Sequence, residues 1–405
     1  MRAIEENPEG ISQADVIVGI PSYNEASSIS FPTTQVDAGL SKYFREYSRV
    51  IINCDNNSPD GTKRAFMDTP TDNPKVYLST AEGVKGKGNN FRNLFEKALQ
   101  LGAQAVVVVD ADLKSITPEW VRNLGRPLFE DFSFVAPLYV RHKYDGTITN
   151  NIAYPLTRAL YGRRVRQPIG GDFGFSGELA RVYMESESWT DHVVHFGIDV
   201  WMTSLAMLSR VSVIQSFMGR PKIHKPKDPA ADLGPMFADV VGTIFDVMDR
   251  HAEFWREVRW SRPTAVYGFG LGDVEIPPEV TVDVKALGAK FLSGMETGRD
   301  IYRETLSPET HGKLEEAAGL PLEGFEFPSA LWAQVLYDYA YAYHTRAVPG
   351  ADLMKSLIPL YNGRTLSFVL ETEFMNTQQV EELIEDQCVQ FEKTKRYLVD
   401  RWFGA

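Results

Sequence analysis

The sequence is poor in cysteine. Its 405 residues include two cysteines, Cys54 and Cys388, which lie far apart in the chain. Two distant cysteines make neither the dense disulfide framework of small secreted domains nor a Cys-x-x-Cys metal or redox site. This cysteine usage predicts a protein of a reducing compartment, which we expect to be the cytoplasm.

The sequence also has no long apolar run and no excess of basic residues. No stretch approaches the roughly 18 consecutive apolar residues that indicate a membrane-spanning helix, and residues 1–13 are polar and acidic, unlike a signal peptide. The formal net charge of −12 argues against general binding to nucleic acids or anionic membranes. We therefore predict no membrane span and no nucleic-acid partner, so any phosphate must be bound by a local pocket or a metal.

Short apolar runs alternate with amphipathic segments in the first half of the chain. Residues 15–20, 49–54, 75–78 and 105–109 are apolar runs typical of buried strands. Helical periodicity occurs between them, most clearly in residues 90–101. Strands and helices that alternate at this length predict an α/β fold, in which helices flank a mostly parallel sheet. Ligands of such sheets bind at the carboxyl ends of the strands.

The pattern changes in the second half. Helical segments surround a glycine-rich stretch at residues 167–176. Four prolines in residues 220–236 predict a long loop, which we expect to close over bound ligand. We predict a catalytic domain at residues 1–236 and a mainly helical region at residues 237–405. The helical region is expected to serve packing or the formation of a homodimer and to contribute no catalytic group.

The strongest chemical signal is the segment Asp110-Ala111-Asp112, which directly follows a run of four valines. Two carboxylates at the active edge of a sheet offer the oxygen ligands that suit Mg²⁺ or Mn²⁺. Such an ion acts as a Lewis acid and neutralises a diphosphate leaving group. A solvated turn is the alternative interpretation, because Asp-x-Asp is a common sequence.

Three further segments follow the ends of predicted strands. Pro21–Glu25 offers a rigid proline, an aromatic ring and polar groups, as a nucleobase pocket requires, and a helix-capping turn is the alternative. Asp55 is a candidate acceptor for a base imide or a ribose hydroxyl. The stretch Gly83–Asn90 contains Lys85 and Lys87, whose charge suits a phosphate. A flexible turn explains that stretch as well.

Three other residues are weaker candidates from the sequence alone. Asp172 lies in the glycine-rich stretch, where nothing but function obviously demands a carboxylate. Asp199 opens an apolar helix, so an interaction with the helix dipole also explains it. His224 is a lone histidine, and such residues are more often structural or exposed than metal ligands.

The order of these segments resembles that of the family-2-like GT-A glycosyltransferases, whose fold is Rossmann-like. Pro-x-Tyr-Asn-Glu, Asp-Asn-Asn, Gly-Lys-Gly and Asp-Ala-Asp follow one another within residues 14–115. The segments Gln167–Asp172, Phe196–Asp199 and Lys222–His224 extend the resemblance. They are similar to segments of glucosyl-3-phosphoglycerate synthases and of the related glucosylglycerate and mannosylglycerate synthases.

The resemblance implies a retaining hexosyltransferase that uses a UDP- or GDP-hexose donor, Mg²⁺ or Mn²⁺, and a small hydroxy-acid acceptor. It implies that Asp112 and His224 hold the metal. Asp199 stands where relatives usually carry a glutamate that touches the donor sugar. Acceptor binding in the group involves a Gly-Arg-x-Thr stretch, here Gly146–Thr149. Thr147 replaces the arginine, a natural phosphate clamp, which favours glycerate over phosphoglycerate.

Two other functions remain open at this stage. One is a sugar-1-phosphate nucleotidyltransferase, which would carry a glycine-rich, basic loop after its first strand. The other is a non-catalytic protein that binds a nucleotide sugar without turnover. The predicted nucleotide-sugar contacts are Pro21, Tyr23, Glu25, Asp55, Lys87, Asp110 and Ala111. The predicted acceptor contacts are Gly146, Thr147, Thr149 and Asn150. The predicted catalytic residues are Asp172 and Asp199, and the predicted metal ligands are Asp112 and His224.

Overall fold

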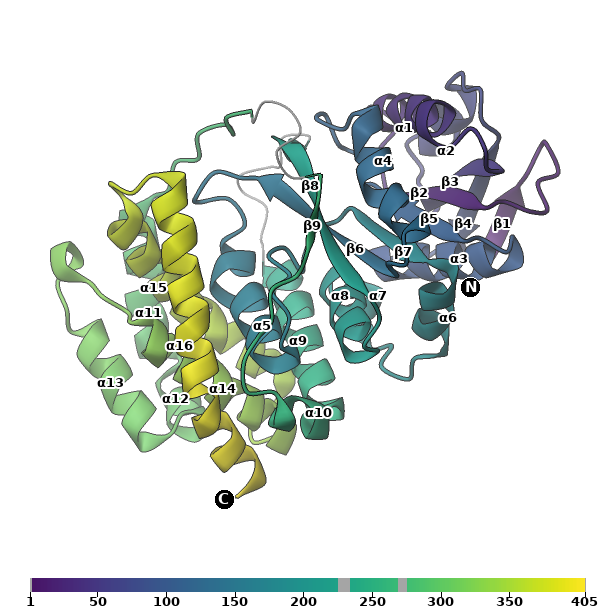
Figure 1. Ribbon diagram of the computed structural model, residues 1–405. Coiled ribbons are helices and arrows are strands. Elements are labelled where there is room, and N and C mark those ends of the chain that lie inside the picture. The colour runs from purple at the N-terminus through teal and green to yellow at the C-terminus, as the bar shows by residue number, and fades with distance from the viewer. Residues whose placement is uncertain (1, 225–233, 269–274, 405) are drawn as a thin grey trace. The chain divides into compact units, whose positions relative to one another are not determined.

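The computed structural model describes residues 2–224, 234–268 and 275–404 of the chain (Figure 1). Residues 225–233, which form most of the predicted ligand-closing loop, lie outside the described residues. Within the described residues, no helix is both long enough and apolar enough to cross a bilayer.

The chain divides into two compact units that interleave along the sequence. Residues 142–164 group with the C-terminal helices, and residues 264–277 group with the N-terminal sheet. A single boundary after residue 236 was predicted from the sequence. Helical periodicity does not show which neighbours a short segment packs against, so it could not indicate that the two units interleave. The sheet unit comprises Met1–Arg141, Val165–Asp232 and Thr264–Pro277, and the helical unit comprises His142–Arg164, Leu233–Pro263 and Pro278–Ala405.

The sheet unit is built on a mostly parallel sheet, whose nine strands in the described residues have the order β1-β4-β3-β2-β5-β7-β6-β8-β9. The four strands predicted from apolar runs, β2 to β5, are parallel neighbours at its centre. β7 is antiparallel to both of its neighbours, β5 and β6. The strands are β1 Arg2–Glu6, β2 Val16–Ser22, β3 Arg49–Asp55, β4 Lys75–Thr80, β5 Ala105–Val108, β6 Phe134–Val140, β7 Phe173–Ser176, β8 Val213–Pro221 and β9 Val266–Tyr267.

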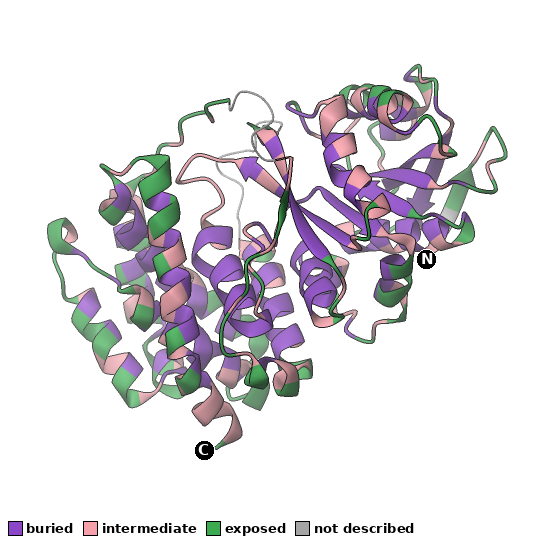
Figure 2. Cartoon of the chain, viewed as in Figure 1, coloured by how far each residue is buried: buried purple, intermediate pink, exposed green. Residues whose placement is uncertain are grey.

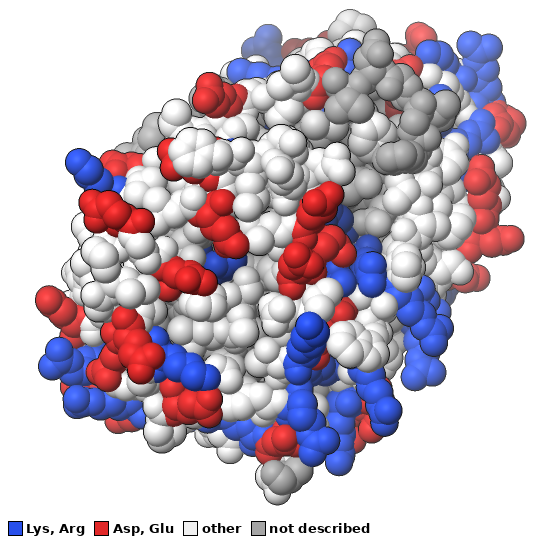
Figure 3. All heavy atoms as spheres, turned by 60° about the vertical axis from the view of Figure 1, so that its left-hand side comes forward, with Lys and Arg blue, Asp and Glu red and all other residues white. Residues whose placement is uncertain are grey.

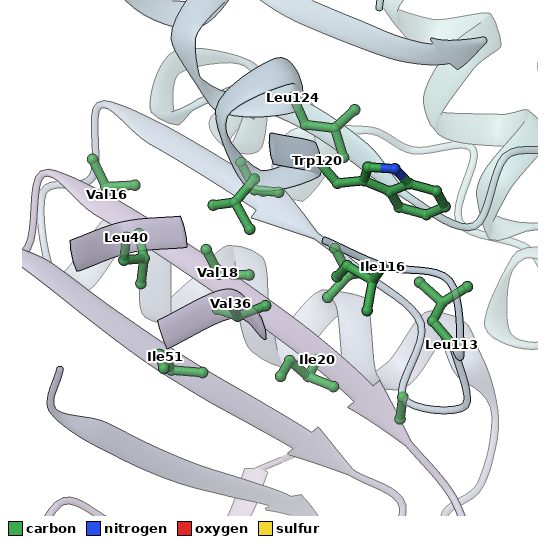
Figure 4. Close-up of a cluster of buried hydrophobic side chains, with 14 of the residues drawn as sticks. Val16, Val18, Ile20, Val36, Leu40, Ile51, Leu113, Ile116, Trp120 and Leu124 are labelled. Carbon is green, nitrogen blue, oxygen red and sulfur yellow. The ribbon is translucent and has the colours of Figure 1, made fainter. Parts of the chain in front are cut away.

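Helices cover both faces of this sheet, which explains why its central strands contain runs of consecutive apolar residues. Every residue of β2 and β4 is buried (Figure 2). On one face, Val18 of β2 packs with Leu40 of α1 and Trp120 of α4 in a single core cluster (Figure 4). Successive strand residues point to opposite faces, and a Cβ on Gly19 would collide with Leu94 of α3. Helix α3 therefore covers the other face.

Helix α3 begins earlier than the periodicity indicated, at Lys87 rather than Asn90. The residue before it, Gly86, has a φ of +123°, which glycine adopts without strain. The remaining helical segments of the sheet unit are α1 Ser30–Tyr43, α2 Thr62–Asp68, α4 Pro118–Gly125, η1 Arg126–Phe129, α6 Gly177–Glu185, α7 Asp191–Val194 and α8 Ile198–Leu208, and α3 ends at Gln100.

The helical unit has its own buried core. Trp332 donates a hydrogen bond to Asn151 O at 2.7 Å, and Tyr337 donates one to Phe391 O at 2.8 Å, so these large side chains serve packing within the unit. The buried Arg158 forms ion pairs with two glutamates of α16, the buried Glu392 and the partly exposed Glu385. The segments of the unit are η2 Thr149–Ala153, α5 Tyr154–Tyr161, α9 Gly234–Arg250, α10 Ala252–Glu257, α11 Val284–Thr297, α12 Arg299–Thr305, α13 Pro308–Ala318, η3 Leu322–Gly324, α14 Ser329–Thr345, α15 Gly350–Thr372 and α16 Thr377–Phe403.

The predicted fold class is confirmed: helices flank a mostly parallel sheet, and the C-terminal region is mainly helical. The surface carries charges of both signs. Acidic and basic side chains both occur on the face shown in Figure 3, with wide uncharged areas between them. On that face the negative net charge of the chain is therefore not gathered into one continuous acidic field.

Candidate active site

The turns that follow β2 and β3 form one rigid rim at the carboxyl edge of the sheet. Ser22 and Asp55 are register partners in the two strands, and the Ser22 hydroxyl donates to Asp55 Oδ1 at 2.7 Å. Three backbone N–H groups of the first turn donate to side chains of the second: Asn24 to Ser58, Glu25 to Thr62 and Ala26 to Asp60, at 2.8, 2.8 and 3.0 Å. These hydrogen bonds hold the backbone of the two turns together, and so set the positions of the side chains that the turns carry.

Asp55 is fully buried and accepts four hydrogen bonds from the protein. The donors are the hydroxyls of Ser22, Ser58 and Tyr77 and the backbone N–H of Ser58, at 2.7 to 2.9 Å. An ionised carboxylate offers about four lone-pair sites, so the protein already uses them all. A base or ribose that bonds to Asp55 must displace one of these donors, and the nucleoside role of Asp55 stays a prediction.

Tyr23 is the aromatic member of the Pro21–Glu25 segment, and its side chain is exposed. Its exposed fraction is 38%, whereas Pro21 is buried and the Glu25 carboxylate accepts a hydrogen bond from Ser28. The ammonium of Lys85 lies 4.9 Å from the centroid of the Tyr23 ring. An exposed ring with a cation beside it suits stacking against an aromatic base.

The Gly-Lys-Gly segment is shaped by packing as well as by any ligand. A Cβ on Gly86 or Gly88 would collide with the backbone carbonyls of Val194 and Val193 in the α7 segment. These glycines therefore let the start of α3 lie directly against α7. Lys87 is the first residue of α3, and the N-terminus of a helix attracts anions through its free N–H groups and its dipole.

Lys87 joins two of the predicted carboxylates. Its ammonium lies 3.3 Å from Asp110 Oδ1 and 3.1 Å from Asp199 Oδ1. Burial by itself lowers the pKa of Lys87, but Asp110 and Asp199 more than offset this effect and raise it above its usual range. Lys87 therefore remains charged, and its side chain keeps 22% of its surface exposed.

Lys222 is the second ammonium of the site and is almost completely buried, with 2% of its side chain exposed. It donates to Asp110 Oδ2, Asp172 Oδ2 and Gly170 O at 2.8, 2.8 and 2.7 Å. Burial lowers the pKa of Lys222, but the two carboxylates outweigh burial and raise it. One buried cation therefore ties Asp110, Asp172 and the glycine-rich stretch together.

Asp172 has no exposed surface, and its contacts are with the protein. Its Oδ1 accepts the backbone N–H of Asp110 at 2.9 Å, and its Oδ2 accepts the Tyr139 hydroxyl. Burial raises the pKa of Asp172 in spite of Lys222. Burial also acts to raise the pKa of Asp110, but Lys222 and Lys87 overcome it and hold that pKa well below its usual range. Asp172 thus supports Asp110, and its predicted role in catalysis stays a prediction.

His224 is brought to Asp112 by a short antiparallel pairing. Leu113 and His224 form an isolated β-bridge, and Lys114 N donates to Ile223 O at 2.8 Å. As a result, His224 Nδ1 lies 3.1 Å from Asp112 Oδ1, and both side chains are partly exposed, at 28% and 21%. The segment after Asp112 thus pairs with the segment that carries His224 and sets its position.

Asp110, Asp112 and His224 offer ligand atoms that all lie within 4.8 Å of one another. Two carboxylates and one imidazole form an oxygen-rich donor set, which fits Mn²⁺ or Mg²⁺ better than a thiolate-preferring metal. Both oxygens of Asp110 are already paired with lysines. Asp112 and His224 are therefore the members of the group that are best placed to ligate an ion. Ala111, between the two aspartates, is buried and contributes only backbone groups.

The four predicted acceptor residues belong to the helical unit. Thr149 and Asn150 are buried in the π-helical turn η2, and Gln387 donates to Asn150 O at 2.7 Å. Gly146 has a φ of +72°, and its carbonyl accepts the N–H of Asn150 at 3.0 Å. The Thr147 hydroxyl shares a 2.5 Å hydrogen bond with Tyr361 OH. The stretch is therefore ordered by internal bonds, and its acceptor role stays a prediction.

Two residues of the site were not identified from the sequence. Lys222 lies two positions before His224, and alternate residues of an extended segment lie on the same side, so this spacing was a usable signal. Tyr139 lies near the end of β6, whose sequence contains Pro137. A proline within an apolar run argues against a central strand, which explains why this strand was missed.

Comparisons with solved structures find similar folds. The chain resembles glucosyl-3-phosphoglycerate synthase from Mycobacterium tuberculosis in complex with Mn²⁺, UDP and glucosyl-3-phosphoglycerate, with 20% identity, a TM-score of 0.45, and coverage of 58% of this chain and 80% of that chain. A complex of that enzyme with Mn²⁺, UDP-glucose and phosphoglyceric acid gives 20% identity, a TM-score of 0.44, and coverage of 59% and 80%. No protein-family model and no curated protein matches the sequence.

Gly171 tests how tightly the glycine-rich stretch is fitted around Lys222. Its φ is +78°, and a Cβ there would meet Asp110 Oδ2 and lie 2.5 Å from Lys222 Nζ. Gly83 is a matched control, because its φ is +79° and a Cβ there meets nothing within 4 Å. We expect Gly83→Ala to lower the free energy of unfolding by about 1 kcal/mol through backbone strain. Gly171→Ala should cost about 1–3 kcal/mol more through overpacking. Urea unfolding followed by circular dichroism measures both, and equal losses would show that the stretch is not fitted to Lys222.

Proposed function

We propose that the chain is a divalent-metal-dependent glycosyltransferase that moves a hexose from a UDP- or GDP-hexose to glycerate or a similar small hydroxy acid. The observation that carries this proposal is the Asp112–His224 pair, which is linked through Asp110 to Lys87 at the start of α3. Two side chains that can ligate a metal and one lysine that can bind a phosphate thus lie at the carboxyl edge of a mostly parallel sheet. Both suit a nucleoside diphosphate leaving group, whose negative charge a metal ion and a lysine neutralise.

Each residue of the edge has a role in this proposal. Asp112 and His224 would hold Mg²⁺ or Mn²⁺, and when bound the ion neutralises charge on the departing diphosphate. Lys87 exchanges one of its carboxylate contacts for a phosphate oxygen, which its partly exposed position permits. The N–H groups at the start of α3 support the same phosphate. Tyr23 stacks on the base, and Pro21 and Glu25 keep the Tyr23 turn in place.

The sugar is oriented by Asp199, whose carboxylate is fixed by Lys87. Asp172 accepts the backbone N–H of Asp110 and shares Lys222 with it, and it acts on the sugar only through these contacts. Neither carboxylate is an open nucleophile, because Asp172 is fully buried and Asp199 is paired. The acceptor hydroxyl therefore attacks the anomeric carbon directly, from the face that the diphosphate leaves, with retention of configuration. The bond between the sugar and the diphosphate breaks, and the departing diphosphate takes the proton of the hydroxyl. The chain contributes positioning and stabilisation of the leaving group, which together supply most of the rate enhancement in such reactions.

A sugar-1-phosphate nucleotidyltransferase is a weaker candidate. Its phosphate-binding loop would follow the first strand of the parallel sheet, where this chain has the segment Pro-Ser-Tyr-Asn-Glu, without glycine or lysine. A non-catalytic nucleotide-sugar-binding protein would use the same pocket without turnover. The products formed from nucleotide sugars separate these alternatives.

The first test concerns turnover and its metal dependence. We expect the protein with Mn²⁺ to release UDP or GDP from one of UDP-glucose, GDP-glucose and GDP-mannose when glycerate is present. Asp112→Asn should lower this rate at least about 100-fold, because neutralisation of the leaving group supplies several kcal/mol. Asp68→Asn on α2, whose side chain is 68% exposed, is the control and should keep full activity.

Mass spectrometry of the products measures this outcome. Full activity in excess EDTA would contradict the metal-dependent mechanism. Release of a nucleoside triphosphate from nucleotide sugar and pyrophosphate would instead support the nucleotidyltransferase. Binding of a donor without any product would support the non-catalytic alternative.

The second test concerns the acceptor. Thr147 stands where the resembling group has an arginine clamp, so we expect a higher kcat/KM for glycerate than for 3-phosphoglycerate. Thr147→Arg should raise kcat/KM for phosphoglycerate about 10-fold, since a hydrogen bond to a charged group contributes about 1.5–3 kcal/mol. Thr147→Met controls for the loss of the bond to Tyr361 and should bring no such gain. A wild-type preference for phosphoglycerate would place the phosphate-binding charge on other residues.

A further inference from the structure

Lys222 has no hydrogen-bond donor left for a substrate. A lysine ammonium has three N–H groups, and these meet Gly170 O, Asp110 Oδ2 and Asp172 Oδ2 at 2.7 to 2.8 Å. The side chain is 2% exposed. Tyr139 contacts two of the same partners, because its hydroxyl donates to Asp172 and lies 3.1 Å from Gly170 O. Lys222 therefore acts on the protein and not on a ligand.

Asp110 is the carboxylate on which Lys222 has the greatest effect. Its Oδ2 accepts from Lys222 and its Oδ1 lies 3.3 Å from Lys87, so two ammonium groups share one carboxylate. At the same time, an oxygen of Asp110 lies within 4.8 Å of the ligand atoms of Asp112 and His224. Asp110 is thus near enough to become a third ligand, and its lysine partners compete with a metal for it.

We propose that Lys222 is a positioning residue that keeps Asp110 out of the metal shell. This inference rests on the proposed metal site. With Asp110 held back, Asp112 and His224 are the ligands that the described residues supply, and the other coordination positions are open to phosphate oxygens. A third carboxylate would bind the ion more tightly without nucleotide and would occupy a position that the diphosphate needs. Lys222 therefore makes metal binding depend on the donor.

Removal of the Lys222 charge tests the proposal through metal affinity, without any sugar transfer. The full chain is titrated with Mn²⁺, alone and with UDP or GDP, and free Mn²⁺ is followed by its electron paramagnetic resonance signal. We expect Lys222→Met to bind Mn²⁺ alone at least about 10-fold more tightly than the wild type, the lower end of the effect of residues that hold metal ligands. UDP or GDP should increase the Mn²⁺ affinity of this variant by a smaller factor than it increases that of the wild type. Asp110→Asn, added to Lys222→Met, should restore the wild-type affinity.

Lys114→Met is the matched control. It removes the same charge from an exposed residue of the segment that pairs with Ile223 and His224, and it should leave Mn²⁺ binding unchanged. Lys222→Met leaves Asp172 buried without its cation, which destabilises the folded chain. If circular dichroism shows that this variant is unfolded, Lys222→Met with Asp172→Asn removes both charges, and the same tightening is expected.

The results of this titration separate the proposal from the function on which it rests. Equal or weaker Mn²⁺ binding by a folded Lys222→Met variant would overturn the proposal, as would tightening that persists after Asp110→Asn. Tightened binding in a chain that transfers no sugar would support the proposal and contradict the glycosyltransferase. Absence of Mn²⁺ binding in the wild type and every variant, with and without nucleotide, would overturn both.

Discussion

The arrangement of the site depends on one buried cation, the ammonium of Lys222. It neutralises Asp110 and Asp172, and it fixes the carbonyl of Gly170. Two carboxylates this close cannot both stay ionised in a buried place without a counter-charge. Once Lys222 is in position, its own segment places His224 beside Asp112 through the bridge to Leu113. The same interaction therefore sets the charge of the strand end and the position of the candidate metal ligands.

The rest of the sheet unit can be understood from this constraint. Gly171 must lack a Cβ because Asp110 and Lys222 occupy the space. The antiparallel strand β7 follows directly, so the glycine-rich stretch reaches the sheet beside β5, at the end of which Asp110 lies. Lys87 then pairs with the other carboxylate oxygen of Asp110, since Gly86 and Gly88 let α3 start against α7. Gly86, Gly88 and Gly171 thus each permit a close approach that a larger residue would block.

The central strands and the candidate site were predictable from sequence to different degrees. Strands β2 to β5 are buried on both faces, so each contains a run of consecutive apolar residues. The position of Asp110 and Asp112 at the ligand-binding edge was predictable because ligands of such sheets bind at the carboxyl ends of the strands. The supporting contacts were not, because they join residues far apart in sequence: Lys222 bonds Asp110, and Tyr139 bonds Asp172. Asp55 shows the converse, since its sequence position suggested a ligand contact while its lone pairs are filled by neighbours.

The central claim is that Asp112 and His224 hold a divalent ion at the carboxyl edge of the sheet. Anomalous X-ray scattering from crystals of the full chain grown with Mn²⁺ and a nucleoside diphosphate tests it most directly. We expect one strong manganese peak at about 2.0–2.3 Å from oxygen and nitrogen atoms of these two residues, with Asp110 still paired to Lys222. A manganese peak elsewhere, or none at this edge with nucleotide bound, would contradict it.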